Sequence, residues 1–251
     1  MSSHLQKIGR IRAQLASEGA AGAVLSTPDN IFYATGFSSV MDGWHLVEPI
    51  AAVFVPADTA SPVVLILPEA SVISPIVSER GGHPVHFDRL ATFDMLNFCE
   101  TARAEDAHLA LPKDLLAELG GVMEQIDGQC EPDIIQSIAA CLSRHVSKEE
   151  RILFDDLRVA ARVEASTGQA SGDALDAMFA ARAVKTADEL DTLRESGQIA
   201  DAIMTYTMSQ LGVGKSWSEV EKQVAHFMID HDVDPLPGSP MLFGGAYDLV
   251  F

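Results

Sequence analysis

The chain has 251 residues, 47% of them apolar, and this length and composition suit one large or two modest globular domains. Its 36 acidic and 17 basic side chains give a formal net charge of −19, which repels phosphate backbones and anionic lipid headgroups. We therefore expect no nucleic-acid partner and no membrane partner. Apolar runs such as Val63–Leu67 are far too short to span a membrane. The N-terminus has no signal-peptide pattern and the 3 cysteines are widely spaced, so we expect a cytoplasmic protein.

The first part of the chain, up to about residue 145, alternates between helical and strand patterns. Apolar residues three or four positions apart predict a first helix that ends near Gly19, and compact apolar runs predict strands. These strands are expected at 23–25, 50–55 and 63–67, with a helix following over 69–79. Further strands are predicted at 85–87 and 108–111, each followed by a helical pattern, at 93–101 and 113–126. The alternation predicts a three-layer α/β domain.

Beyond about residue 145 the strand signals vanish and helix starts accumulate. Three segments fit the capping box, in which a hydroxyl and a glutamate three residues later close the first turn of a helix: Ser147–Glu150, Thr186–Glu189 and Ser216–Glu219. The last two predicted helices carry apolar stripes and should lie against a larger surface. We place a domain boundary in this stretch, with residues 1–181 forming one domain, including a helical linker from about 145, and residues 182–251 beginning another.

Three local patterns resemble ligand sites, and each also has an ordinary structural interpretation. Gly212–Ser216 ends like a phosphate-binding Walker A loop, but it lacks the preceding strand, and Ser216 fits a helix cap. Nucleotide binding through these residues stays open as a third possibility. His83 and His86 are expected at the surface, because a strand would point them to opposite faces. The acidic and histidine residues of 230–234 are the polar residues expected in a turn before a proline.

No nucleophile pattern is present, and nothing in the spacing of the acids and bases selects a catalytic pair. The sequence therefore assigns no catalytic residue and no metal ligand.

Two separated segments carry a longer-range resemblance. The first, Asp29–Phe37, contains the element Asn-x-x-Tyr-x-Thr-Gly-Phe, and the second runs from Arg182-Ala-Val-Lys185-Thr186 through Glu189 and Leu193-Arg194 to Glu219-Val-Glu221. In both order and separation they resemble the creatinase, prolidase and aminopeptidase P family of pita-bread metallohydrolases. We interpret Arg182, Lys185 and Glu189 as residues that define the fold rather than as catalytic groups.

The resemblance implies a ribonuclease-H-like N-terminal domain, followed by the helical start of a pita-bread α+β domain that is incomplete here. Members of the family are usually dimers. Most of them hold a pair of divalent metals through carboxylates and a histidine, and a metal-bound water attacks an amide beside proline or a related C–N bond. Those ligands belong to later strands, and no residue of this sequence matches them. We therefore expect that the chain ends before the metal ligands and binds no metal itself.

The resemblance also implies that the loop after the first motif can reach the active site of the partner subunit. In this loop Trp44 and His45 are the candidates for shaping the substrate pocket of the neighbour. The expected function is thus that of the N-terminal portion of a C–N hydrolase, similar to Xaa-Pro peptidases, creatinase or ectoine hydrolase, that acts on a peptide or small amide as a homodimer. The alternative is a non-catalytic scaffold or dimerisation protein.

Overall fold

The computed structural model describes residues 3–39, 42, 48–95 and 112–233. The chain forms two compact units, residues 1–184 (unit 1) and residues 185–251 (unit 2). The family domain boundary placed at Ala181 stays a prediction, and the compact units divide after Val184. Within the described ranges no helix is long and apolar enough to cross a membrane.

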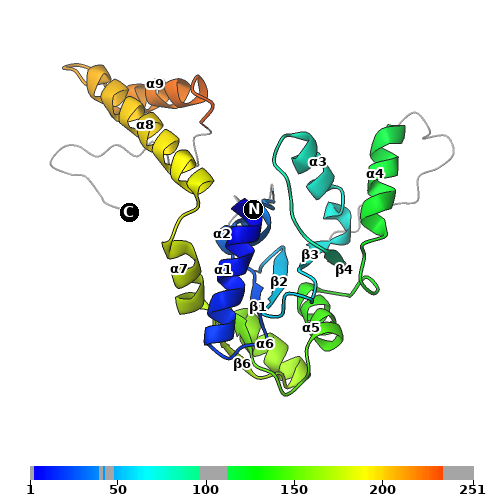
Figure 1. The fold of residues 1–251 in the computed structure, drawn as a ribbon. Helices are drawn as coiled ribbons and strands as arrows, with labels where there is room; N and C mark the ends of the chain where they lie inside the picture. Colours follow the sequence, from blue (N-terminus) through cyan, green and yellow to red (C-terminus); the bar gives the residue numbers. More distant parts are fainter. Residues whose placement is uncertain (1–2, 40–41, 43–47, 96–111, 234–251) are drawn as a thin grey trace. The chain divides into compact units, whose positions relative to one another are not determined.

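Unit 1 is an α/β structure built on one sheet (Figure 1). The strands of the described part are β1 Gly22–Leu25, β2 Ala52–Pro56, β3 Val64–Pro68, β4 Arg89–Phe93, β5 Ile152–Phe154 and β6 Ser171–Asp173. They lie in the order β4-β3-β2-β1-β5-β6. β2 is antiparallel to both of its neighbours, whereas β3–β4, β1–β5 and β5–β6 are parallel pairs. Every residue of β1, β2, β3 and β5 is buried, as expected for strands covered on both faces.

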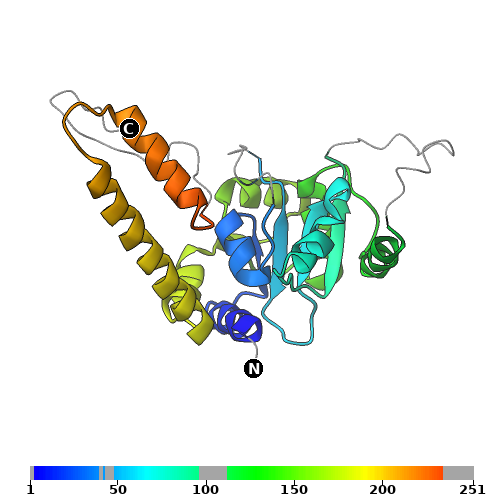
Figure 2. The ribbon, with the colours of Figure 1, turned by 90° about the horizontal axis from the view of Figure 1, so that it is seen from above.

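Successive strand residues point to opposite faces, so the sheet divides the core of unit 1 in two. Leu25, Val53 and Leu65 belong to one cluster, together with apolar residues of α1 (Ser3–Ser17), α2 (Pro28–Thr35) and α7 (Leu175–Ala183). Phe54 and Ile66 belong to the other, with residues of α5 (Ile134–His145) and α6 (Leu157–Thr167). Helices therefore cover both faces of the sheet, as the ribbon seen from above also shows (Figure 2). The predicted three-layer α/β arrangement is present in this unit.

Three shorter helical segments complete the described part of unit 1: the 3₁₀ turn η2 Glu69–Ser71, α3 Ser74–Arg80 and α4 Lys113–Met123. The sequence predicted one helix over 69–79, and the structure interrupts it at residues 72 and 73. Pro75 stands in the first turn of α3, the position where a missing N–H costs least. The helix predicted at 113–126 is confirmed as α4, and the segment predicted as a strand at 108–111 lies outside the described residues.

Two predictions before residue 145 are wrong. Residues 85–87 form no strand; the strand is β4, over residues that the sequence assigned partly to a helix beginning at Phe93. β4 pairs in parallel with β3 from Val64↔Arg89 to Pro68↔Phe93. Backbone pairing with an already buried strand therefore decides the conformation of this segment, against its weak local pattern. The remaining part of the predicted helix, 96–101, lies outside the described residues.

The prediction that strands end at residue 145 is also wrong, because β5 and β6 follow it. The capping-box residues Ser147 and Glu150 do make one of the expected bonds, from the Ser147 N–H to the Glu150 carboxylate at 2.9 Å. No helix follows, however, since Ile152–Phe154 pairs with β1 in the sheet. A run of three apolar residues is too short to reveal by periodicity whether it belongs to a helix or a buried strand.

Unit 2 consists in its described part of α8 (Ala187–Gln210) and α9 (Trp217–Ile229). Both predicted capping boxes are confirmed, with Thr186 and Ser216 as N-caps bonded in both directions to Glu189 and Glu219. The core of this unit is small: Val220, Val224 and Met228 of α9 are buried, with Ile203, Tyr206 and Val233 packed against them. On α8 only Thr207 is buried.

Candidate functional site

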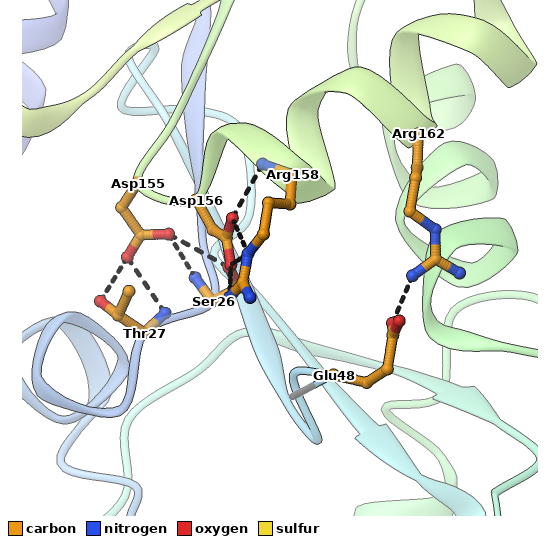
Figure 3. Close-up of polar contacts among 7 residues, drawn as sticks. All are labelled: Ser26, Thr27, Glu48, Asp155, Asp156, Arg158 and Arg162. Carbon is orange, nitrogen blue, oxygen red and sulfur yellow. Dashed lines mark hydrogen bonds and ion pairs between the residues drawn. The ribbon is translucent and has the colours of Figure 1, made fainter. Parts of the chain in front are cut away.

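In the described part of unit 1, the carboxylate of Asp155 is the centre of a set of polar contacts (Figure 3). Asp155 follows β5, and its oxygens accept hydrogen bonds from Ser26 and Thr27, which follow the neighbouring parallel strand β1. The backbone N–H groups donate at 2.8 Å and 3.1 Å, and the hydroxyl groups donate at 3.2 Å and 2.6 Å, from Ser26 and Thr27 respectively. Asn30 adds a fifth bond from Nδ2 at 3.0 Å. The carboxylate thus fixes the start of α2 against the end of β5.

The next residue, Asp156, serves a different purpose. It is the N-cap of α6 and accepts from the backbone N–H of Arg158 at 2.8 Å. The guanidinium of Arg158 also contacts this carboxylate, with Nη2 to Oδ2 at 2.7 Å, and this bond lowers the pKa of Asp156 below its usual value. Further along α6, Arg162 pairs with Glu48, which lies just before β2 (Figure 3). Two adjacent carboxylates therefore hold separate elements, and neither is left to act as a free acid or base in this arrangement.

The two sequence motifs meet beside the Asp155 cluster. Arg182 donates from Nη1 to Oδ1 of Asn30 at 3.0 Å, so Asn30 bridges Asp155 and Arg182. Tyr33 donates its hydroxyl to the carbonyl oxygen of Ala181 at 2.9 Å, and its ring lies 5.9 Å from Cζ of Arg182. The contact spans 152 positions in the sequence, from the first motif to the second. We call the set Asn30, Tyr33, Asp155, Ala181 and Arg182 the motif junction.

Sequence reasoning missed Asp155 and Asp156, which nothing had singled out. Their signal is positional: both come directly after the buried apolar run Ile152–Phe154. Polar residues at the carboxyl end of parallel strands gather at one edge of a sheet. Because the segment was predicted as helical, that rule could not be applied to it.

Tyr33 also lines a small cavity. Lys7 of α1 places Nζ 5.4 Å from the centre of the Tyr33 ring, and the rings of His4 and His86 stack with their centroids 4.1 Å apart. Burial, His86 and Lys7 together lower the pKa of His4 to about 4. His4 is therefore neutral at neutral pH.

The residues predicted for substrate-pocket shaping, Trp44 and His45, lie outside the described residues. Gly36, the next-to-last residue of the first motif, ends α2 in the left-handed conformation that favours glycine, with φ of 77°. A Cβ at this position would lie 2.6 Å from the carbonyl oxygen of Pro84. Position 36 therefore requires glycine for two reasons: the positive φ and the short distance between an added Cβ and Pro84.

The other sequence patterns are placed as follows. Ser216 caps α9, and Lys215 donates from Nζ to Gln210 at 3.2 Å, so these two residues have structural partners. His231 contacts the Phe227 carbonyl oxygen at 2.8 Å. Asp234 lies outside the described residues. Throughout the part of the chain that the structure describes, no group of three or more His, Cys, Asp or Glu side chains could hold a metal ion.

Comparison with known proteins agrees with the motifs. Residues 7–73 match the model of the creatinase/prolidase N-terminal domain. No curated protein matches the sequence. Among solved structures, a prolidase from Thermococcus sibiricus is similar with a TM-score of 0.58 and 14% identity, over 92% of this chain and 51% of that one.

Two further solved structures give the same result. An Xaa-Pro dipeptidase from Bacillus anthracis has a TM-score of 0.58 and 15% identity, over 91% of this chain and 49% of its own. A dipeptidase from Mycobacterium ulcerans has a TM-score of 0.56 and 17% identity, again over 91% and 49%. At these identities the likeness concerns the fold, and the chain spans about half the length of these proteins. The resemblance seen in the sequence is confirmed: residues 7–73 match the creatinase/prolidase N-terminal domain, and the fold is similar to that of a prolidase and an Xaa-Pro dipeptidase.

Proposed function

We propose that the chain is the N-terminal portion of a metal-dependent C–N bond hydrolase of the Xaa-Pro dipeptidase type. The match of residues 7–73 to the creatinase/prolidase N-terminal domain carries this proposal. It is supported by the similarity of the fold to solved structures described as a prolidase and as an Xaa-Pro dipeptidase. The motif junction gives it a physical basis, because the two family motifs bind each other directly through Asn30 and Arg182.

Unit 1 then corresponds to the ribonuclease-H-like domain, and unit 2 to the start of a pita-bread domain. The strand order and the single antiparallel strand β2 within the described sheet support the first assignment. The two capped helices of unit 2 support the second, since the family resemblance predicted them at these positions.

The metal pair implied by the family does not fit the described residues of this chain, where no ligand cluster is found. The carboxylate of Asp155, for example, is engaged by five hydrogen bonds from Ser26, Thr27 and Asn30. We therefore assign the metal, and the chemical step, to other residues of a larger protein. The role of this portion is to form the homodimer and to shape the substrate pocket through Trp44 and His45, in a cytoplasmic protein.

The test uses the natural gene product, with its intact mass determined. Hydrolysis of Gly-Pro and of the control dipeptide Gly-Leu is measured after treatment with a chelator and again after divalent cations are restored. We expect cleavage of Gly-Pro that depends on the added metal, and a dimer by light scattering. Trp44→Ala and His45→Ala should each lower kcat/KM for Gly-Pro by at least about tenfold, the loss of one good contact in the transition state.

The outcomes separate the proposal from its alternative. A dimer that hydrolyses no Xaa-Pro peptide or small amide with any divalent metal would identify a scaffold protein instead. If hydrolysis occurs and both substitutions leave the kinetic constants unchanged, the pocket-shaping role of Trp44 and His45 is wrong, while the family function stands.

A further inference from the structure

The cavity beside Tyr33 is formed by three separate parts of unit 1: the first turns of α1, the helix α2 and the segment before β4. Its volume is about 160 Å³. This is well above the ~15 Å³ that one water requires and below the ~300 Å³ at which sites for drug-sized ligands begin. Its size therefore suits a small molecule rather than a nucleotide or a peptide of several residues.

Among the described residues, His4, Lys7 and His86 are the nitrogen-bearing side chains that line the cavity, and no described carboxylate lines it. This is unusual in a chain with a net charge of −19. The first turn of α1, which holds His4, contains no acidic residue, so the positive end of this helix is not neutralised there. The local charge thus favours an anion, although the charge of the whole chain repels one.

The remaining lining residues are Ser3, Phe32, Tyr33, Gly36 and Pro84, two of which are aromatic. Phe32 and Tyr33 both line the cavity, and Phe32 is 55% exposed, which is a large exposure for a phenylalanine on a helix of the core domain. The Tyr33 hydroxyl is bonded to Ala181 and the residue is only 7% exposed, so a small part of its ring faces the cavity and Phe32 offers the larger exposed ring surface. An apolar group would cover these rings and would gain about 25 cal/mol for each Å² of apolar surface removed from water.

We propose that this cavity binds a small carboxylate carried on an apolar body, with Lys7 and the His4–His86 pair facing the carboxylate and Phe32 and Tyr33 contacting the apolar part. The site shares Tyr33 with the motif junction, where the hydroxyl of that residue is bonded to Ala181, and it does not depend on the proposed hydrolase function. Lys7 supplies a permanent positive charge, and the imidazole N–H groups supply hydrogen bonds.

Binding should be linked to the protonation of His4. At neutral pH His4 is neutral, because burial, His86 and Lys7 lower its pKa to about 4; Arg12 lowers it further and Asp88 opposes the shift. A bound carboxylate favours the protonated imidazole and so raises this pKa. Affinity for the carboxylate should therefore increase as the pH falls from 7 towards 5.

The experiment titrates the full chain with benzoate and follows the imidazole resonances of His4 and His86 by ¹⁵N NMR at constant ionic strength. Neutral benzamide, which has the same ring, is the matched ligand control. Lys7→Gln is the test variant, and Lys148→Gln, at an exposed position away from the cavity, is the matched control variant. Circular dichroism checks that each variant is folded.

We expect saturable shifts of both histidines with benzoate, with an affinity at least about tenfold higher than that for benzamide. Lys7→Gln should weaken benzoate binding about tenfold or more, and Lys148→Gln should leave it unchanged. His86→Gln should abolish the shift of His4. The proposal is overturned if benzoate gives no saturable shift, if benzamide binds equally well, or if Lys7→Gln and Lys148→Gln behave alike in folded proteins.

Discussion

At the scale of single residues, Asp155 is the side chain on which most of the local order around β1, β5 and α2 depends. Asp155→Asn replaces one acceptor oxygen by an NH₂ group, which cannot accept from Thr27 or Asn30. Each hydrogen bond to a charged group contributes about 1.5–3 kcal/mol, and unpaired donors add to the loss. We expect unfolding in urea to require about 3 kcal/mol less free energy, with an unchanged m value.

Asp173 provides the control for this prediction, because it is the last residue of a parallel strand, β6, and lies at the surface. Its carboxylate accepts from the Leu175 N–H at 2.8 Å, a bond that asparagine can also accept. Asp173→Asn should therefore change the free energy of unfolding by less than about 0.5 kcal/mol. Equal effects of the two substitutions would contradict the role given to Asp155.

A comparison of Gly36 with Gly82 separates the cost of a positive φ from the cost of the contact that an added Cβ makes with Pro84. Gly36→Ala forces a Cβ into the left-handed region and to within 2.6 Å of the Pro84 carbonyl oxygen. Gly82, with φ of 85°, has nothing within 4 Å of the same added atom. Gly82→Ala should cost about 1 kcal/mol for the backbone conformation alone. Gly36→Ala should cost at least ~2 kcal/mol in the same denaturant measurement, and a cost no larger than that of Gly82→Ala would show that Pro84 moves aside freely.

At the scale of whole elements, α8 depends strongly on its first turn because it buries so little of its surface. The Thr186 hydroxyl accepts from the Glu189 N–H at 3.2 Å, and Glu189 returns a bond to the Thr186 N–H at 2.8 Å. Thr186→Ala should reduce the stability of the helix by about 1 kcal/mol, seen as faster amide exchange in the first turns of α8. Thr192→Ala, in the second turn of the same helix, should leave exchange unchanged or slow it, because alanine has the higher helix propensity.

The same capping pattern shows how far local sequence predicts an element. At Thr186 and Ser216 nothing competes with the helix, and the pattern predicts its start correctly. At Ser147 the side chains make part of the same motif, yet the next residues complete the sheet between β1 and β6. Pairing with β1, more than a hundred residues away in the sequence, and with β6 decides between the two outcomes.

The contacts of the candidate site also depend on residues that are far apart in the sequence. The sequence identified Asn30 and Arg182 separately, through the family motifs, but their contact depends on the folding of unit 1 as a whole. The Asp155 carboxylate accepts hydrogen bonds from Ser26 and Thr27, which lie 129 and 128 positions earlier in the sequence. No local sequence pattern could have predicted this contact. The family resemblance thus predicted the right segments, and the structure supplied the interactions between them.

At the scale of the whole molecule, the two units differ greatly in the size of their cores. Unit 1 has two clusters that cover both faces of the sheet, whereas the buried cluster in the described part of unit 2 has Val220, Val224 and Met228. Regions with few buried apolar contacts open at lower free energy. We therefore expect hydrogen exchange in the full chain to proceed through opening of α8 and α9 well before β1, β2 and β3 exchange.

Two substitutions of the same type test whether the units open independently. Val224 in α9 and Val53 in β2 are both fully buried, with 0% exposure, and truncating either to alanine should cost about 2 kcal/mol. Val224→Ala should accelerate exchange in α8 and α9 and leave β1, β2 and β3 unchanged, as followed by mass spectrometry of peptides. Val53→Ala should accelerate exchange throughout the sheet. If Val224→Ala destabilises the strands as much as the helices, the two units unfold as one cooperative structure, and the small core of unit 2 is stabilised by more than its own buried residues.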